Sequence, residues 1–107
     1  MKDFIMANKK VTLVAKISAK AGQEDALKAH LLNLVPPSRA ESGCINYDLH
    51  QSIDTPTEFM FYENWTNQEA LDFHNGTDHL TTLPEKIGDL LAKDVELFFY
   101  NMLSEPA

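Results

Sequence analysis

A carboxylate, an indole and two imidazoles stand close together in the second half of the chain. The segment 59–79 reads FMFYENWTNQEALDFHNGTDH and contains Glu63, Trp65, His74 and His79. A carboxylate and an imidazole can take and return protons near neutral pH, and an indole can stack on a flat molecule. These residue types therefore predict a proton-transfer site for a small molecule.

Local structure is expected to bring these side chains together. Residues 59–65 alternate as a β-strand, and one face of that strand carries Phe59, Phe61, Glu63 and Trp65. Thr66 and Glu69 have the spacing of a capping box, so a helix should begin directly after the strand, with Leu71 and Phe73 as its apolar anchors. Gly76 should end this helix. The strand end and the short helix would then share one site.

Three more strands are predicted, at residues 11–18, 44–50 and 95–102. These segments are rich in β-branched, aromatic and alternating residues. Within the second of them, Ile45 and Tyr47 should share one face of the strand. The predicted sheet therefore has four strands.

Two further helical stretches complete the pattern. The first should open at residues 23–25, and a kink at residues 36–37 (Pro-Pro) should be followed by one more turn through Glu41. Its apolar stripe consists of Leu27, Leu31 and Leu34. The second helix should start at residues 82–85, which again have capping-box spacing. The order β-α-β-β-α-α-β predicts an α+β fold, a ferredoxin-like split βαβ sandwich.

Length, charge and cysteine content limit the class of protein. The chain has 107 residues, and we place one domain at residues 10–103, between an N-terminal extension (1–9) and a C-terminal tail (104–107). A net charge of −7 argues against nucleic acid or an anionic membrane as partner. The single Cys44 cannot form an intramolecular disulfide, and no signal peptide or membrane-spanning stretch is recognisable. A cytoplasmic location is therefore expected.

The last predicted strand suggests a second subunit. The run Leu97-Phe98-Phe99-Tyr100 is apolar on both faces. One layer of helices covers only one face of a sheet, so a partner chain should cover the other. A homodimer is expected.

Several segments, taken in order, resemble the antibiotic biosynthesis monooxygenase domain. They begin at residues 11, 38, 62, 70 and 78 and read VTLVAKI, SRAESGCINYDL, YENW, ALDFH and DHL. The resemblance covers residues 10–102 and implies a dimeric α+β barrel with a pocket between sheet and helices in each subunit. It also implies oxygenases that use neither metal nor flavin on small aromatic diols and anthrones. Two branches look similar, one of quinol monooxygenases and one that isomerises the phosphorylated autoinducer-2 signal.

On this basis the leading hypothesis is a cofactor-free monooxygenase that acts with O₂ on a quinol or anthrone. His74 or His79 would be the base, with Glu63 as its orienting partner. The substrate would lie against Trp65, Tyr47 and Phe61. Each residue also has a structural interpretation, as core aromatic, ion-paired carboxylate or surface histidine.

Two other functions stay open, and no metal or other cofactor is expected. On one continuous helix, His74 and His79 would point roughly 140° apart, which argues against a metal site. The same imidazoles could serve an isomerase or other proton-transfer enzyme for a small phosphorylated compound, if Lys16 or Lys20 lay at the pocket. A non-catalytic, ligand-binding dimer is the third possibility.

Overall fold

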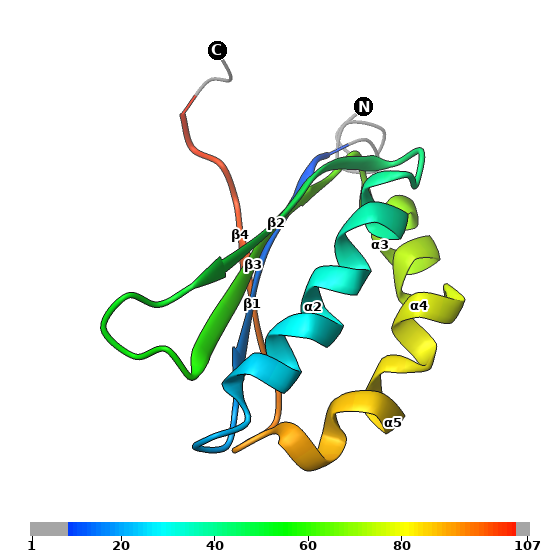
Figure 1. Cartoon of the computed structure of the whole chain (residues 1–107). Helices are drawn as coiled ribbons and strands as arrows, with labels where there is room; N and C mark the ends of the chain where they lie inside the picture. Colours follow the sequence, from blue (N-terminus) through cyan, green and yellow to red (C-terminus); the bar gives the residue numbers. More distant parts are fainter. Residues whose placement is uncertain (1–8, 105–107) are drawn as a thin grey trace.

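The computed structural model describes residues 9–104, and within them a single sheet is covered on one face by helices (Figure 1). Residues 1–8 and 105–107, which make up most of the two predicted terminal segments, lie outside the described residues. Among the described residues, no helix has the length and apolar character needed to cross a membrane.

The sheet has four antiparallel strands in the order β2-β3-β1-β4. Their bounds are β1 Val11–Ser18, β2 Cys44–Gln51, β3 Glu58–Trp65 and β4 Glu96–Tyr100. Because β3 inserts between the parallel pair β1 and β2, this is the split βαβ arrangement. The predicted ferredoxin-like α+β fold is confirmed, although β4 is shorter than the predicted strand at 95–102.

One long helix and several short ones form the second layer. Their bounds are α2 Glu24–Arg39, α3 Gln68–Asn75, α4 Asp78–Thr81, α5 Leu83–Ile87 and the 3₁₀ turn η1 Gly88–Leu90. Figure 1 shows α2 lying along the sheet, with α3, α4 and α5 following one another beside it. Helix α2 ends at Arg39, earlier than predicted. Glu41 therefore lies in the turn that leads to β2.

The core lies between these two layers. Strands β1 and β3 each present every second residue to the helices, as an alternating strand must. The buried apolar residues of this core include Leu13, Ala15 and Ile17 of β1, Phe59, Phe61 and Trp65 of β3, and Leu27, Leu31 and Leu34 of α2. Full burial of one such leucine contributes about 1.5–3 kcal/mol relative to exposure. The predicted faces of β3 and α2 are therefore confirmed.

Both helix starts in the second half differ from the predicted capping boxes. The backbone N–H of Thr66 bonds the Gly43 carbonyl at 2.9 Å, so Thr66 still belongs to the sheet end. Asn67 caps α3 instead, its side-chain oxygen accepting the Ala70 N–H at 2.8 Å. Thr82 does not cap α5: its backbone is already helical (φ −89°, ψ −10°), and its hydroxyl donates to the Asp78 carbonyl at 2.7 Å.

Two apolar side chains lie where the pattern did not place them. A bulge between Cys44 and Asn46 shifts the register of β2, and Ile45 is 53% exposed while Tyr47 is buried. Phe73 is 67% exposed, because α3 turns Leu71 and His74 toward the core. The predicted anchoring role of Phe73 is therefore wrong, and a histidine takes that buried position.

The opposite face of the sheet carries no helix (Figure 1). Val14, Lys16, Tyr62, Phe98 and Tyr100 lie on this face, and the ammonium of Lys16 is 5.6 Å from the centre of the Phe98 ring. Tyr62, Phe98 and Tyr100 are 37%, 38% and 55% exposed. This is a large aromatic surface for a chain of this size.

Candidate active site

The two histidines come from separate short helices. His74 lies in the last turn of α3, and His79 lies in α4, which starts at Asp78 after the chain has left α3 at Gly76. The chain changes direction at this break. His74 is 2% exposed, and the side chain of His79 is 23% exposed. The two imidazoles therefore approach one point from two helices.

A carboxylate that the sequence did not single out joins the two imidazoles. The Oε2 atom of Glu41 lies 2.8 Å from Nδ1 of His74 and 2.8 Å from Nε2 of His79. An ionised carboxylate only accepts hydrogen bonds, so each of these ring nitrogens carries a proton. The side chains of Glu41 and His74 are 6% and 3% exposed. Glu41 thereby fixes the tautomer and the orientation of both rings.

The turn after α2 holds Glu41 in this position. Gly43 packs so closely on α3 that a Cβ atom at this residue would collide with the Ala70 side chain. The Cys44 N–H bonds the Glu41 carbonyl at 3.0 Å, which closes the turn. An acid just beyond a helix C-terminus is opposed by the helix dipole, so this carboxylate depends on its two imidazole donors. Its second oxygen, Oε1, is buried and has no hydrogen-bond partner among the described residues.

A small cavity lies between the sheet and the helices. Its volume is about 170 Å³, and its lining is apolar except for Tyr47, Glu63, His74 and Asn75. A cavity with an apolar wall and a few convergent polar groups is the usual form of a small-molecule site. Glu41 is not part of the lining. The His74 ring therefore lies between Glu41 and the cavity. Its Nδ1 atom is bonded to Glu41, so Nε2 is the ring nitrogen that remains for a molecule in the cavity.

Glu63 is the second ionisable group of the cavity. It occupies the central strand β3, opposite Leu13 of β1 and Tyr47 of β2. Burial raises the pKa of Glu63 to about 7, although the hydrogen bond from Trp65 Nε1, 2.9 Å long, acts in the opposite direction. A carboxyl group with this pKa can take up or release a proton at neutral pH.

Aromatic contacts hold these groups in place. The Tyr47 ring stacks on Phe61 with centroids 4.5 Å apart, and the His74 ring lies 4.3 Å from Trp65. Burial raises the pKa of Tyr47 well above its usual range, so its hydroxyl keeps its proton and can donate a hydrogen bond. Burial also lowers the pKa of His74, which the bond to Glu41 opposes. His74 is therefore held as a neutral imidazole.

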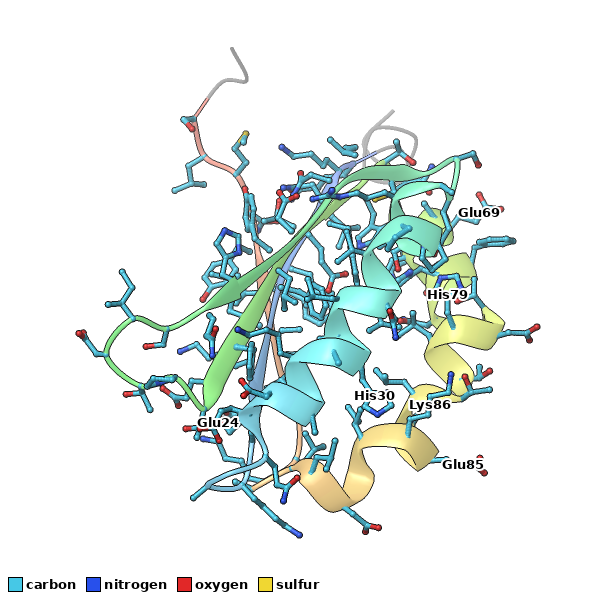
Figure 2. The ribbon with its side chains drawn as sticks, viewed as in Figure 1. Glu24, His30, Glu69, His79, Glu85 and Lys86 are labelled. Atoms are coloured by element: carbon cyan, nitrogen blue, oxygen red, sulfur yellow. The ribbon has the colours of Figure 1, made fainter. Side chains whose placement is uncertain are left out.

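The predicted residues divide into two groups. Tyr47, Phe61, Glu63 and His74 all line the cavity. Trp65 and His79 do not line it. Trp65 packs against His74 and bonds Glu63, and His79 is linked to His74 through Glu41. Figure 2 shows His79 in the space between α2 and α4.

Glu63 is the predicted orienting partner of the imidazoles, but in the structure Glu41 has this position. Glu63 bonds Trp65, whereas Glu41 bonds both histidines. One signal for Glu41 was present in the sequence: an acid near a helix C-terminus, where bases are favoured.

The same three side chains also form a set of metal-binding atoms. The imidazole nitrogens of His74 and His79 and a carboxylate oxygen of Glu41 all lie within 4.8 Å of one another. The expectation that the two imidazoles would diverge assumed one continuous helix. The break between α3 and α4 removes that assumption, because both rings point at Glu41.

Relatives of known sequence and structure match nearly the whole domain. A Synechocystis protein is 32% identical over 96 residues, which are 90% of this chain and 65% of that protein, so the chain spans about two thirds of its length. A Mycobacterium tuberculosis protein is 33% identical over 95 residues, covering 89% of this chain and 93% of its own. A Pseudomonas aeruginosa crystal structure has a TM-score of 0.86 at 36% identity, with 92% of this chain and 98% of that chain covered.

A shorter match joins the chain to a different activity. A 4-hydroxy-5-phosphonooxypentane-2,3-dione isomerase of Salmonella paratyphi B is 33% identical over 51 residues, which are 48% of this chain and 53% of the isomerase. The family model for antibiotic biosynthesis monooxygenase matches residues 10–85, which include Glu41, Tyr47, Glu63, His74 and His79. The chain therefore belongs to the antibiotic biosynthesis monooxygenase family.

Proposed function

We propose that this protein is a cofactor-independent monooxygenase for a small, electron-rich hydroxylated aromatic of the quinol or anthrone type. The observation that carries the proposal is the apolar cavity, which is lined by His74 and Glu63. His74 is an uncharged imidazole, and the pKa of Glu63 is about 7. Membership of the monooxygenase family supports the reaction class. The volume of about 170 Å³ lies below the roughly 300–1,000 Å³ of sites for drug-sized ligands, so the substrate should be small.

The proposed reaction takes its electrons from the substrate. Loss of a proton gives a substrate anion, which passes one electron to O₂. The substrate radical and superoxide then join through a new C–O bond to give a peroxide. As the O–O bond breaks, the carbon that carries the peroxide loses a second proton. The two protons and one oxygen atom leave as water. The other oxygen stays as a carbonyl, so an anthrone and O₂ give an anthraquinone and water.

Two proton transfers match the two proton acceptors of the cavity. His74 takes the first proton at Nε2, because Glu41 holds the ring proton at Nδ1. Glu63 takes the second proton, and burial has already moved its pKa to about 7. Tyr47 donates a hydrogen bond to a substrate oxygen, and Phe61 forms part of the apolar wall. His79 and Trp65 act as positioning residues, since they support Glu41, Glu63 and His74.

The alternative isomerase chemistry has less support from the lining. The cavity-lining side chains include no lysine or arginine among the described residues. Lys16, which could have bound a phosphate, lies on the opposite face of the sheet beside Phe98. A phosphorylated substrate would therefore meet Glu63 without a compensating cation. A non-catalytic binding role would not require the two proton acceptors, His74 and Glu63.

We further propose that the active unit is a homodimer joined through the helix-free face. The aromatic side chains of β4 on that face, Phe98 and Tyr100, are 38% and 55% exposed. A second copy seated on this face would cover these exposed aromatic side chains.

Oxygen uptake with a panel of quinols and anthrones tests the proposal. Metal-stripped, flavin-free protein should accelerate uptake above a no-enzyme control at each pH. His74→Gln should lower the rate by about 10²- to 10⁴-fold, the usual contribution of a general base. The exposed His50→Gln variant is the matched control and should keep the full rate. Absence of acceleration across the panel, or full activity in His74→Gln, would refute the assignment.

A further inference from the structure

We propose that Glu41, His74 and His79 form a binding site for one divalent first-row transition-metal ion, and that the bound ion switches off the base. The set consists of two imidazoles and one carboxylate, donors that suit ions such as Zn²⁺, Co²⁺ or Fe²⁺. Metal binding does not depend on the proposed function. Only the inhibitory consequence rests on it.

The three donor atoms lie close to the spacing that a metal ion requires. Metal–nitrogen bonds of 2.0–2.1 Å and metal–oxygen bonds of similar length put neighbouring donors about 2.9 Å apart at right angles, and about 3.4 Å apart in a tetrahedron. In the structure, each imidazole nitrogen is 2.8 Å from the same carboxylate oxygen. Each nitrogen would need to move about 0.1–0.6 Å away from the carboxylate oxygen, and the two nitrogens, which lie within 4.8 Å of one another, would need to come to about 2.9–3.4 Å apart as neighbouring ligands.

The charge of the cluster also favours a cation. The side chain of Glu41 is 6% exposed, and its carboxylate is hydrogen-bonded by the imidazoles of His74 and His79. The nearest arginine in sequence, Arg39, is paired with Asp48 at 2.8 Å. The Oε1 atom of Glu41 is buried without a hydrogen-bond partner among the described residues. A bound cation would pair with this buried carboxylate.

An ion can reach the cluster from outside the substrate cavity. Glu41 lines a surface hollow of about 370 Å³ together with Glu69 and Phe73, and Figure 2 shows Glu69 at the outer surface of α3. The His79 side chain is 23% exposed. Two carboxylates at this hollow and a net charge of −7 attract cations to it. The hollow and the substrate cavity share no lining residue.

The bound ion changes what His74 offers to the cavity. In the metal-free protein the ring proton is on Nδ1, and Nε2 has a free electron pair. When the ion takes Nδ1, the ring proton must reside on Nε2, which then becomes a donor and cannot accept a proton. The metal therefore competes with the tautomer that the reaction needs.

Cobalt titration of the untagged full-length protein tests the site. Co²⁺ should bind with a stoichiometry of one per chain, produce d–d absorption bands, and quench the fluorescence of Trp65, the single tryptophan, whose ring lies 4.3 Å from His74. Glu41→Gln and His79→Gln should each weaken binding at least 10-fold. His50→Gln and Cys44→Ser, which alter ligand-type side chains outside the cluster, should leave the affinity unchanged. Zn²⁺ at saturation should lower the quinol-oxidation rate at least 10-fold.

The outcomes separate the two proposals. No stoichiometric Co²⁺ binding, or equal affinity in wild type and His79→Gln, would overturn the metal site and leave the proposed oxygenase standing. Because His79 is partly exposed, its variant is expected to fold even if Glu41→Gln does not. Site-specific binding without any loss of rate would overturn the inhibitory role. Site-specific binding in a protein that oxidises no quinol would uphold the metal site and refute the proposed function.

Discussion

Replacing Glu63 with glutamine should make the protein more stable at alkaline pH. Glu63 is 4% exposed, and burial raises its pKa from 4.5 to about 7. Glutamine has the same shape, and its amide oxygen can still accept the hydrogen bond from Trp65. The substitution therefore removes the buried charge and little else.

The pH window follows from the direction of this shift. Below pH 4.5 both the folded and the unfolded states hold the proton, and the charge costs nothing. Between pH 4.5 and about 7 the unfolded state loses its proton while the folded state keeps it, so stability falls by about 1.4 kcal/mol per pH unit. Above this window both states are ionised, and the accumulated loss is about 3 kcal/mol.

Urea unfolding of wild type and Glu63→Gln from pH 4 to pH 9, at one protein concentration, measures this effect. The two free energies of unfolding should agree near pH 4, and the variant should be more stable by about 3 kcal/mol at pH 8.5. Glu58→Gln is the matched control, since Glu58 is an exposed carboxylate of the same strand. If the difference between wild type and Glu63→Gln did not change with pH, Glu63 would not be the desolvated group described above.

Three further changes test other parts of the structure. Trp65→Ala should lower the free energy of unfolding by about 3–5 kcal/mol, because the side chain is fully buried; unchanged thermal unfolding would contradict this. Gly43→Ala should cost about 1–3 kcal/mol and displace Glu41, because the new methyl group meets Ala70; a variant as stable as wild type would contradict the close approach. Light scattering should give twice the 12.1 kDa chain mass, and Phe98→Asp should reduce it to one chain; a wild-type monomer would refute the dimer.

The sequence predicted those parts of the site that depend on local periodicity. Alternation along β3 placed Phe61, Glu63 and Trp65 on one face, and all three are buried on the helix side of the sheet. The period of two is a property of any extended chain, so it needs no tertiary information. Phe73 could also have been placed correctly. It lies two residues after the buried Leu71 and so on another side of α3, whereas His74 lies three residues after Leu71 and shares its side.

The contacts that define the site could not be predicted in this way. Glu41 lies 33 residues before His74 and 38 before His79, and nothing local links them. The link depends on Gly43 packing against α3 and on the break between α3 and α4, both of which are tertiary features. The capping-box spacing of Thr66 and Glu69 predicted the wrong cap, because both Thr and Asn can cap a helix and the Thr66 N–H is bonded to the end of the sheet.

Labelled oxygen gives the most direct test of the proposed function. Metal-stripped protein should convert an anthrone or quinol under ¹⁸O₂ into a product that contains one ¹⁸O atom, with the second atom recovered in water. His74→Gln should lose this labelled product while His50→Gln retains it. A product without the label, or hydrogen peroxide formed in amounts equal to the oxidised substrate, would show that the protein does not transfer oxygen and would contradict the monooxygenase assignment.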